Sequence, residues 1–241
     1  MIHIKRERTE RRIVLVVGML DSIHLARWLE QFRNQPISFI LFPSSPHRVV
    51  HPMLVRLAKD QQEATYQYVG PAPVASVAFW LVDKLLADGL RGFWLKRIII
   101  KSRPHILHAL EFQHAGYIVN RALKRGKPAN LSLIVTNYGS DIYWFRRFPR
   151  HEAKIRSLLS VADAYSAECQ RDVGMARELG FEGEVKLVAP NAGGFSKSQL
   201  EIGSDDSSIR SVISIKGYQG WVGRASIALD ALEDIAPALR G

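Results

Sequence analysis

The chain has 241 residues, 47% hydrophobic and 23% charged, a balance that is ordinary for a globular protein and sufficient for a sizeable core. Its single cysteine, Cys169, excludes an intrachain disulfide framework and suits a reducing compartment. The net charge of +10 favours anionic partners, such as nucleotide phosphates or an acidic membrane surface. Nucleic acid is not expected, because no helix-turn-helix, zinc or RNA-binding signature accompanies the charge.

Short apolar runs alternate with helical stretches along the chain. The expected strands are, in chain order, 12–17, 37–42, 105–110, 131–136, 162–167 and 185–188. Three helices are expected. The first begins after the N-cap residue Ser22 and ends at about residue 33, the second covers 112–124, and the third covers 168–179 and is ended by Gly180. This alternation predicts an α/β fold with a mostly parallel, Rossmann-like sheet and helices on both faces.

The run 74–100 is rich in Phe, Trp, Leu and Ile, but charged residues interrupt it too often for a membrane-spanning helix. Gly89 and Gly92 indicate two helices or a break. Two interpretations stay open. The run forms an amphipathic pair packed against the sheet, or it forms an interfacial segment in which Phe93 and Trp94 lie beside cations.

The composition changes after residue 195. A polar stretch with a Gly-Ser-Asp-Asp-Ser-Ser run predicts a linker, and a short strand over 211–215 and a helix over 224–239 follow it. One strand and one helix cannot bury an apolar face by themselves, so this part is expected to be the beginning of an incomplete second domain. The expected organisation is a main domain 1–195, a linker 196–210 and an incomplete domain 211–241.

A polar loop, Asn137-Tyr138-Gly139-Ser140-Asp141, follows the apolar run 131–135. Ligands of open α/β sheets bind at the carboxyl ends of strands, which is where this loop is expected. Small residues let a substrate approach the backbone, and Asp141 can either accept hydrogen bonds from hydroxyl groups or cap the following helix. Earlier in the sequence, near the end of the preceding expected strand, His108 and His114 flank Glu111, an arrangement that could orient an acceptor. No metal site is expected there.

Four segments, in this order, resemble the family-4 (group 1) glycosyltransferases of GT-B architecture, particularly bacterial enzymes that build surface polysaccharides. They are the loop and helix start at 18–28, the Gly-Ser-Asp loop at 137–145, the group 165–172, 178–181 and 190–195, and the stretch 216–225. The resemblance implies an acceptor-side domain followed by the opening of a donor-side domain. It also implies sugar transfer from a nucleotide-sugar to a glycan or lipid-linked acceptor, with retained configuration and without a metal or other cofactor.

The resemblance also suggests roles for individual residues. Lys216 and Arg224 fall near the pair of cations that neutralises the donor diphosphate in the family. The alternative is that they are a solvated lysine and an arginine at a helix start. Tyr138 stands where many members have a histidine, and its phenol can donate a hydrogen bond but is a poor base at neutral pH. The candidate residues of the acceptor and cleft loops are Gly18, Asp21, Ser22, His24, His114, Tyr138, Gly139, Ser140 and Asp141, and those of the interdomain loop are Asn191, Gly193 and Gly194.

The largest departure from the family is that no Glu-x7-Glu motif follows the stretch at 216–225. The sequence therefore predicts a truncated enzyme with weak nucleotide affinity and little activity alone. We expect it to be cytoplasmic, at most peripheral at the inner face of the membrane. A second hypothesis remains open, in which the chain is a non-catalytic module that binds an anionic membrane surface or another anionic ligand.

Overall fold

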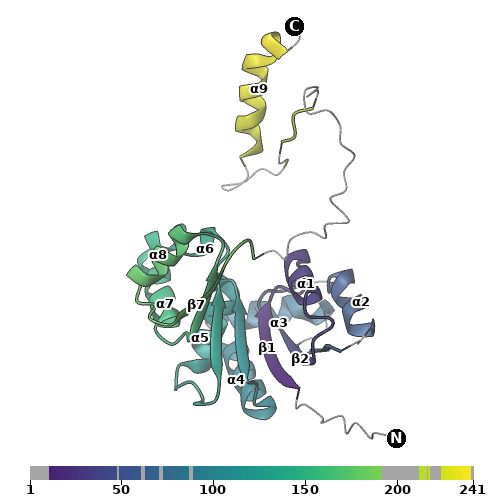
Figure 1. Ribbon diagram of the computed structural model, residues 1–241, viewed down its shortest axis with the longest axis vertical. Coiled ribbons are helices and arrows are strands. Elements are labelled where there is room, and N and C mark those ends of the chain that lie inside the picture. Colours follow the sequence, from purple (N-terminus) through teal and green to yellow (C-terminus); the bar gives the residue numbers. More distant parts are fainter. Residues whose placement is uncertain are drawn as a thin grey trace, which may run out of the picture. The chain divides into compact units, whose positions relative to one another are not determined.

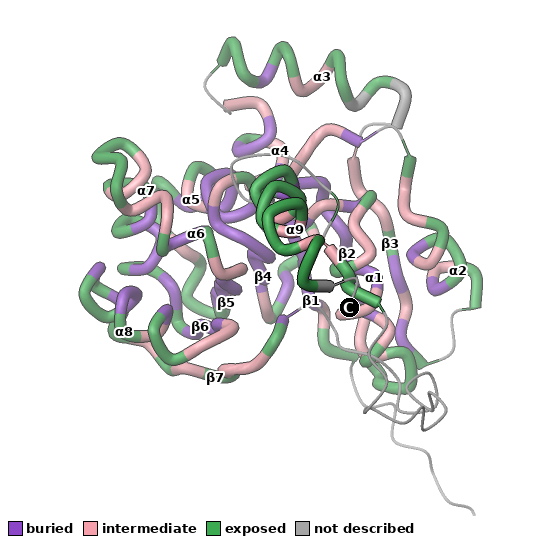
Figure 2. Tube along the Cα trace, turned by 90° about the horizontal axis from the view of Figure 1, so that it is seen from above, coloured by how far each residue is buried: buried purple, intermediate pink, exposed green. Residues whose placement is uncertain are grey.

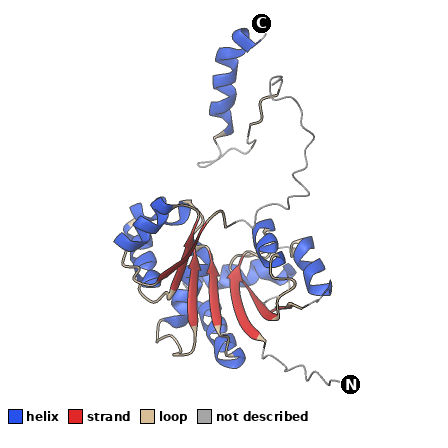
Figure 3. Cartoon of the chain, viewed as in Figure 1, coloured by secondary structure: helices blue, strands red, loops and turns tan. Residues whose placement is uncertain are grey.

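The computed structural model describes residues 11–47, 49–60, 63–70, 73–86, 89–191, 212–215, 217 and 224–239. The chain divides into two compact units, 1–194 and 195–241. The first unit holds a seven-stranded sheet in the order β3-β2-β1-β4-β5-β6-β7, in which every neighbouring pair is parallel (Figures 1 and 3). The strands are β1 Arg12–Gly18, β2 Ile37–Pro43, β3 Thr65–Tyr68, β4 Ile106–Leu110, β5 Ser132–Thr136, β6 Ala164–Ala167 and β7 Glu184–Val188.

Helices follow nearly every strand. Those of the first unit are α1 Ile23–Glu30, α2 Pro52–Asp60, α3 Pro73–Leu85, α4 Gly89–Ser102, the π-helix η1 Phe112–Gly116, α5 Tyr117–Leu123, α6 Ser140–Tyr143, the 3₁₀ turn η2 Phe145–Arg147, α7 Pro149–Leu159 and α8 Gln170–Glu178. The chain first winds outward from β1 to β2 and β3, and then returns to lay β4 on the other side of β1. Because right-handed crossovers in opposite directions put helices on opposite faces, this order covers both faces of the sheet. The predicted α/β, Rossmann-like fold is confirmed.

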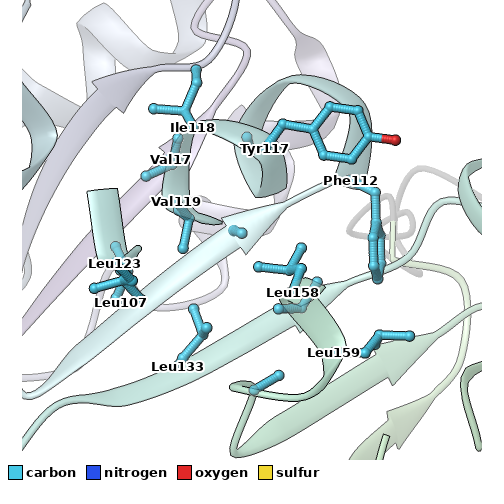
Figure 4. Close-up of a cluster of buried hydrophobic side chains, with 14 of the residues drawn as sticks. Val17, Leu107, Phe112, Tyr117, Ile118, Val119, Leu123, Leu133, Leu158 and Leu159 are labelled. Atoms are coloured by element: carbon cyan, nitrogen blue, oxygen red, sulfur yellow. The ribbon is translucent and has the colours of Figure 1, made fainter. Parts of the chain in front are cut away.

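Alternate side chains of each strand point to opposite faces, and each face carries its own apolar core. On one face Val14, Val16 and Leu41 pack with Leu25 of α1 and Leu54 of α2. The opposite core takes side chains from α4, α5, α7 and α8, and Figure 4 shows part of it. Its labelled residues are Val17, Leu107, Phe112, Tyr117, Ile118, Val119, Leu123, Leu133, Leu158 and Leu159. These two cores fix the strand ends, and thereby the loops that leave them.

The apolar run 74–100 forms two helices, as the glycines indicated, but only the second packs fully. Leu95 and Ile99 of α4 are buried in the core, whereas α3 is exposed along most of its length (Figure 2). None of the helices that the structure describes is long and apolar enough to cross a membrane.

In the second unit the structure describes the helix α9, Ala225–Leu239, close to the predicted bounds. The strand predicted over 211–215 is wrong where it can be compared, because residues 212–215 adopt no regular structure. Val212 is 80% exposed and Ile213 is 57% exposed, so these apolar side chains pack on no strand that the structure describes, and burial against neighbouring strands is what stabilises a strand.

Candidate functional site

The order of the strands reverses between β1 and β4, and this reversal defines the candidate site. All seven strands are parallel, so their carboxyl ends lie at one edge of the sheet and the loops that follow them meet there. In open α/β sheets the crevice beside such a reversal is where ligands bind. The loops after β1, β4 and β5, which contain most of the predicted site residues, leave from this edge.

Glu111, directly after β4, organises one side of the site. It is only 4% exposed and adopts a φ of 88°, which a residue other than glycine rarely adopts. Its carboxylate accepts hydrogen bonds from the backbone N–H groups of His114 (2.9 Å to Oε2) and Ala115, and so caps η1. A buried carboxylate therefore fixes the turn that carries His114.

His114 is the exposed member of this arrangement. Its Nδ1 lies 3.3 Å from Oε2 of Glu111, and its side chain is 47% exposed. The hydrogen bond to Glu111 raises the pKa of His114, against the opposing effects of partial burial and of the cations Lys84 and Arg91. An imidazole held through one nitrogen by a carboxylate leaves the other nitrogen to bind a hydroxyl group or to exchange a proton.

Asp141, in the first turn of α6, ties the loop after β4 to the loop after β5. Its Oδ2 accepts hydrogen bonds from the backbone N–H groups of Phe112 and Tyr138, both at 3.1 Å. Only 6% of the residue is exposed. Burial, and then the nearby carboxylate of Glu111, raise the pKa of Asp141 well above its ordinary value. The structure thus places this predicted residue beneath the loops, with one carboxylate oxygen engaged by the backbone.

The three residues before Asp141 are more accessible. Ser140 is exposed, whereas Tyr138 is partly buried against the core on the α1 side. Burial raises the pKa of Tyr138, so its phenol stays protonated and can donate a hydrogen bond. Gly139 has a φ of 32°, and a Cβ atom there would come within 3.3 Å of Oε2 of Glu168. The predicted loop therefore presents to a ligand the hydroxyl group of Ser140 and the backbone of Gly139, whose conformation favours glycine.

The loop after β1 contributes the remaining predicted acceptor-side residues. Ser22 caps α1 by accepting a hydrogen bond from the backbone N–H of His24 (3.2 Å), and the side chains of Asp21 and His24 are exposed. A Cβ atom on Gly18 would lie 3.4 Å from Leu25 and 3.6 Å from Leu110. The space at Gly18 is thus filled by strand and helix packing.

A second polar network below the loops was not predicted. Asn137 donates to Oδ2 of Asp172 in α8 (2.8 Å) and accepts from the backbone N–H of Ile142 (3.2 Å), while Asn191 donates to the backbone oxygen of Asn137 (3.1 Å). Asp172 is fully buried in the first turn of α8, a position where an acidic residue interacts favourably with the helix dipole. The acidic residue in the first turn of a predicted helix was the one signal in the sequence that could have indicated the role of Asp172.

The other candidate residues lie within the sheet, in the second unit or outside the described residues. His108 is a correction. It does not flank the site, because its side chain is buried in the sheet, where Nε2 lies 2.7 Å from Oγ1 of Thr136. Burial lowers the pKa of His108 to about 3. Arg224, in the second unit, is exposed and precedes α9 with a φ of 50°. Lys216, Gly193 and Gly194 lie outside the described residues.

The part of the chain that the structure describes has no group of three or more His, Cys, Asp or Glu side chains suited to hold a metal ion. The side chains gathered at the strand ends are instead hydrogen-bond donors and acceptors of the kind that bind hydroxyl groups. Chemically, the arrangement can orient a polar ligand and exchange a proton through His114.

No model of a known protein family matches the chain, and no curated protein matches it. Among solved structures, the chain is similar to a structure of S. aureus MnaA with UDP, at 12% identity and a TM-score of 0.47. The similarity covers 73% of this chain and 44% of the MnaA chain. It is also similar to a short-chain dehydrogenase from Oenococcus oeni, at 11% identity and a TM-score of 0.42, over 78% of this chain and 100% of the other. The chain thus spans less than half of the MnaA chain.

Proposed function

We propose that the first unit is the acceptor side of a sugar transferase of GT-B architecture, related to family 4. In this reaction a sugar passes from a nucleotide-sugar to a hydroxyl group of a glycan or lipid-linked acceptor in surface polysaccharide synthesis. The observation that carries the proposal is the half-exposed imidazole of His114, held by the buried carboxylate of Glu111 at the strand reversal. With a lipid-linked acceptor, the enzyme would work as a peripheral protein at the inner face of a membrane.

The chemistry of sugar transfer explains why these side chains suit the acceptor side. The acceptor oxygen bonds to the anomeric carbon, the bond from that carbon to the donor diphosphate breaks, and the proton of the acceptor hydroxyl passes to the departing diphosphate oxygen. His114 would orient that hydroxyl through its free ring nitrogen, while the phenol of Tyr138 and the hydroxyl of Ser140 would bind neighbouring sugar hydroxyls. Asp141 and Glu111 would keep the two loops in place.

The donor side of the proposal rests on the second unit. Lys216 and Arg224 would neutralise the diphosphate as it leaves, because fixed cations stabilise charge that develops in the transition state. Retention of configuration at the anomeric carbon is part of the proposal on the strength of the sequence resemblance alone.

The acceptor side is tested by titrating the ¹⁵N-labelled chain with methyl α-D-mannopyranoside and methyl β-D-glucopyranoside. We expect amide shifts in the loops after β1, β4 and β5. His114→Gln should weaken binding by about two- to tenfold, the effect of one hydrogen bond of about 0.5–1.5 kcal/mol. His105→Gln is the matched control, because His105 precedes β4 at the opposite edge of the sheet. Shifts confined to other parts of the chain, or equal losses in both variants, would refute the assignment.

A further inference from the structure

The outer face of α3 is an uncovered apolar surface. Its exposed side chains, which we call the apolar ridge, are Leu81 (54% exposed), Val82 (49%), Leu85 (86%) and Leu86 (52%), the last directly after the helix. In Figure 2, α3 lies beyond α4 as seen from the sheet and is largely coloured as exposed. Exposed apolar side chains that adjoin one another on a helix mark an interaction surface more often than isolated ones do.

The ridge is held outward by a buried polar anchor. Asp83, on the inner side of α3, accepts a hydrogen bond from the backbone N–H of Arg91 (2.9 Å) and pairs with its guanidinium group. Nη1 of Arg91 in turn donates to the backbone oxygen of Ser44 (2.6 Å), next to the end of β2. The rings of Phe79 and Trp94 meet edge to face, with centroids 5.4 Å apart. These contacts orient α3, so its apolar face points away from the protein for a structural reason.

The surroundings of the ridge are almost entirely cationic. Over the described residues between 73 and 103, the only acidic side chain is the buried Asp83, and the basic ones are Lys84, Arg91, Lys96, Arg97, Lys101 and Arg103. A groove of about 660 Å³ between α4 and α5 continues this charge. Five cations line this basic groove, with no carboxylate among the described residues around it: Lys96, Arg97, Arg121, Lys124 and Arg125.

The floor of the basic groove is apolar as well. Phe93 is 60% exposed and Ile100 is 62% exposed, and the guanidinium group of Arg97 lies 5.7 Å from the centre of the Phe93 ring. Gly92 of α4 allows α4 and α5 to approach each other closely, because a Cβ atom at this position would lie 2.6 Å from Cγ of Arg121 in α5. Exposed rings and aliphatic side chains that alternate with cations suit the boundary between lipid headgroups and acyl chains.

We propose that the apolar ridge and the basic groove together dock the chain on an anionic lipid bilayer, with the ridge among the headgroups and the cations on lipid phosphates. α3 has 13 residues, too few to span a bilayer, for which about 20 are needed, so it would lie in the interface. Among the described residues of this rim no acid is exposed, and such a rim complements a continuous anionic surface better than it complements a protein, whose surface carries both signs of charge.

The docking surface does not depend on sugar transfer, but it bears on the proposed acceptor. Arg91, at the start of α4, pairs with Asp83 of α3 and donates to the backbone oxygen of Ser44, directly after β2, so these helix ends lie at the edge of the sheet from which the loops of the candidate site leave. Docking through the ridge would therefore bring the strand-end site near the lipid surface. This last consequence rests on the proposed function, whereas vesicle binding itself does not.

The test is flotation of the full chain with vesicles of phosphatidylcholine alone and of phosphatidylcholine with phosphatidylglycerol. We expect binding only to the anionic vesicles, weakened by salt. Arg97→Glu with Lys101→Glu should lower the partition coefficient at least about thirtyfold, because each cation near such a surface contributes about 1 kcal/mol and 1.4 kcal/mol is a factor of ten. Adding Leu81→Asp and Leu85→Asp to that variant should abolish the vesicle binding that it retains.

Matched controls lie on α2, which packs on the opposite face of the sheet. Arg56→Glu with Lys59→Glu changes the net charge equally, and Val55→Asp places an acid on a side chain that is 40% exposed. Each variant is compared with the wild type by circular dichroism and thermal melting. If the double leucine variant unfolds, Leu85→Ser at the most exposed position replaces it.

Three outcomes would overturn the proposal. The first is equal binding to both kinds of vesicle, and the second is a loss of binding in the α2 controls as large as in the α3 and α4 variants. The third is a wild-type dimer in light scattering that Leu85→Ser converts to a monomer, which would assign the ridge to a second copy of the chain.

Discussion

Replacing Asp141 tests whether it holds the two loops of the site together. Its Oδ2 accepts hydrogen bonds from the backbone N–H groups of Phe112 and Tyr138, one in each loop. Asp141→Ala removes both acceptor oxygens, whereas Asp141→Asn keeps one oxygen at nearly the same place and removes the charge. The pair of variants therefore separates the hydrogen bonds from the carboxylate charge.

The expected magnitude follows from the burial of these groups. Phe112 is fully buried, so its N–H has no water to replace a lost partner, and the N–H of Tyr138 is partly buried. Each unsatisfied donor costs about 1–3 kcal/mol, and relief from the buried charge offsets part of the sum, so Asp141→Ala should lower the free energy of unfolding by about 2–4 kcal/mol. Asp141→Asn should be at least as stable as the wild type at neutral pH, because it keeps an acceptor oxygen and removes a buried charge whose pKa is raised.

The dependence on pH has a definite sign. Burial and the carboxylate of Glu111 raise the pKa of Asp141 in the folded state above its value in the unfolded chain. The folded state therefore binds the proton more tightly, and this contribution to stability is present below the unfolded pKa and is lost as pH rises through the folded pKa. Relative to Asp141→Asn, the wild type should lose stability as pH rises from about 4.

Urea unfolding of the three proteins at several pH values measures both effects. The difference between wild type and Asp141→Asn cancels the titration of the groups they share. If Asp141→Ala is as stable as Asp141→Asn, the two hydrogen bonds do not hold the loops. If the difference between wild type and Asp141→Asn does not change with pH, the raised pKa of Asp141 is wrong.

Three further predictions concern single side chains. The imidazole of His114 should titrate in NMR spectra above the ordinary histidine pKa, and Glu111→Gln should lower that value, since the hydrogen bond to Glu111 is the main cause of the shift; an unchanged value would contradict the pairing. His108 should remain neutral at mildly acidic pH for as long as the chain stays folded, because burial lowers its pKa to about 3. An imidazole that titrates near neutral pH would contradict the buried position of His108. Gly174 is exposed in α8, and a methyl group there would meet nothing within 4 Å beyond its chain neighbours and the backbone of its own helix. Gly174→Ala should therefore stabilise the protein by about 0.5–1 kcal/mol in thermal melting, and a lower melting temperature would contradict the helix.

The strands that the sequence predicted are those with continuous apolar runs, such as β1 and β5, because burial on both faces of a parallel sheet demands such runs. β3 was missed, since the edge strand Thr65-Tyr-Gln-Tyr is short and half polar. α7 was missed because its Pro-Arg-His-Glu start reads as solvated surface, although Ile155 and Leu158 are buried. Hydrophobic periodicity thus identified the central strands, but not a short edge strand or a helix that begins with polar residues.

The candidate site was predictable in position but not in detail. The change from apolar to polar residues at 135–141 correctly marked the end of β5, and the alternation of elements placed it at the ligand-binding edge. The partners of Asp141 and Asn137 were not predictable, because Phe112 and Asp172 lie 29 and 35 positions away in the chain. Only the register of the sheet brings such residues together.

The acceptor site is tested most directly by intermolecular NOEs between the sugar protons of a methyl glycoside and the imidazole protons of His114. We predict NOEs from the sugar to His114 and to the backbone of Gly139, and a weaker NOE to Gly139 in His114→Gln. A glycoside that binds elsewhere on the chain and gives no NOE to either residue would contradict the account.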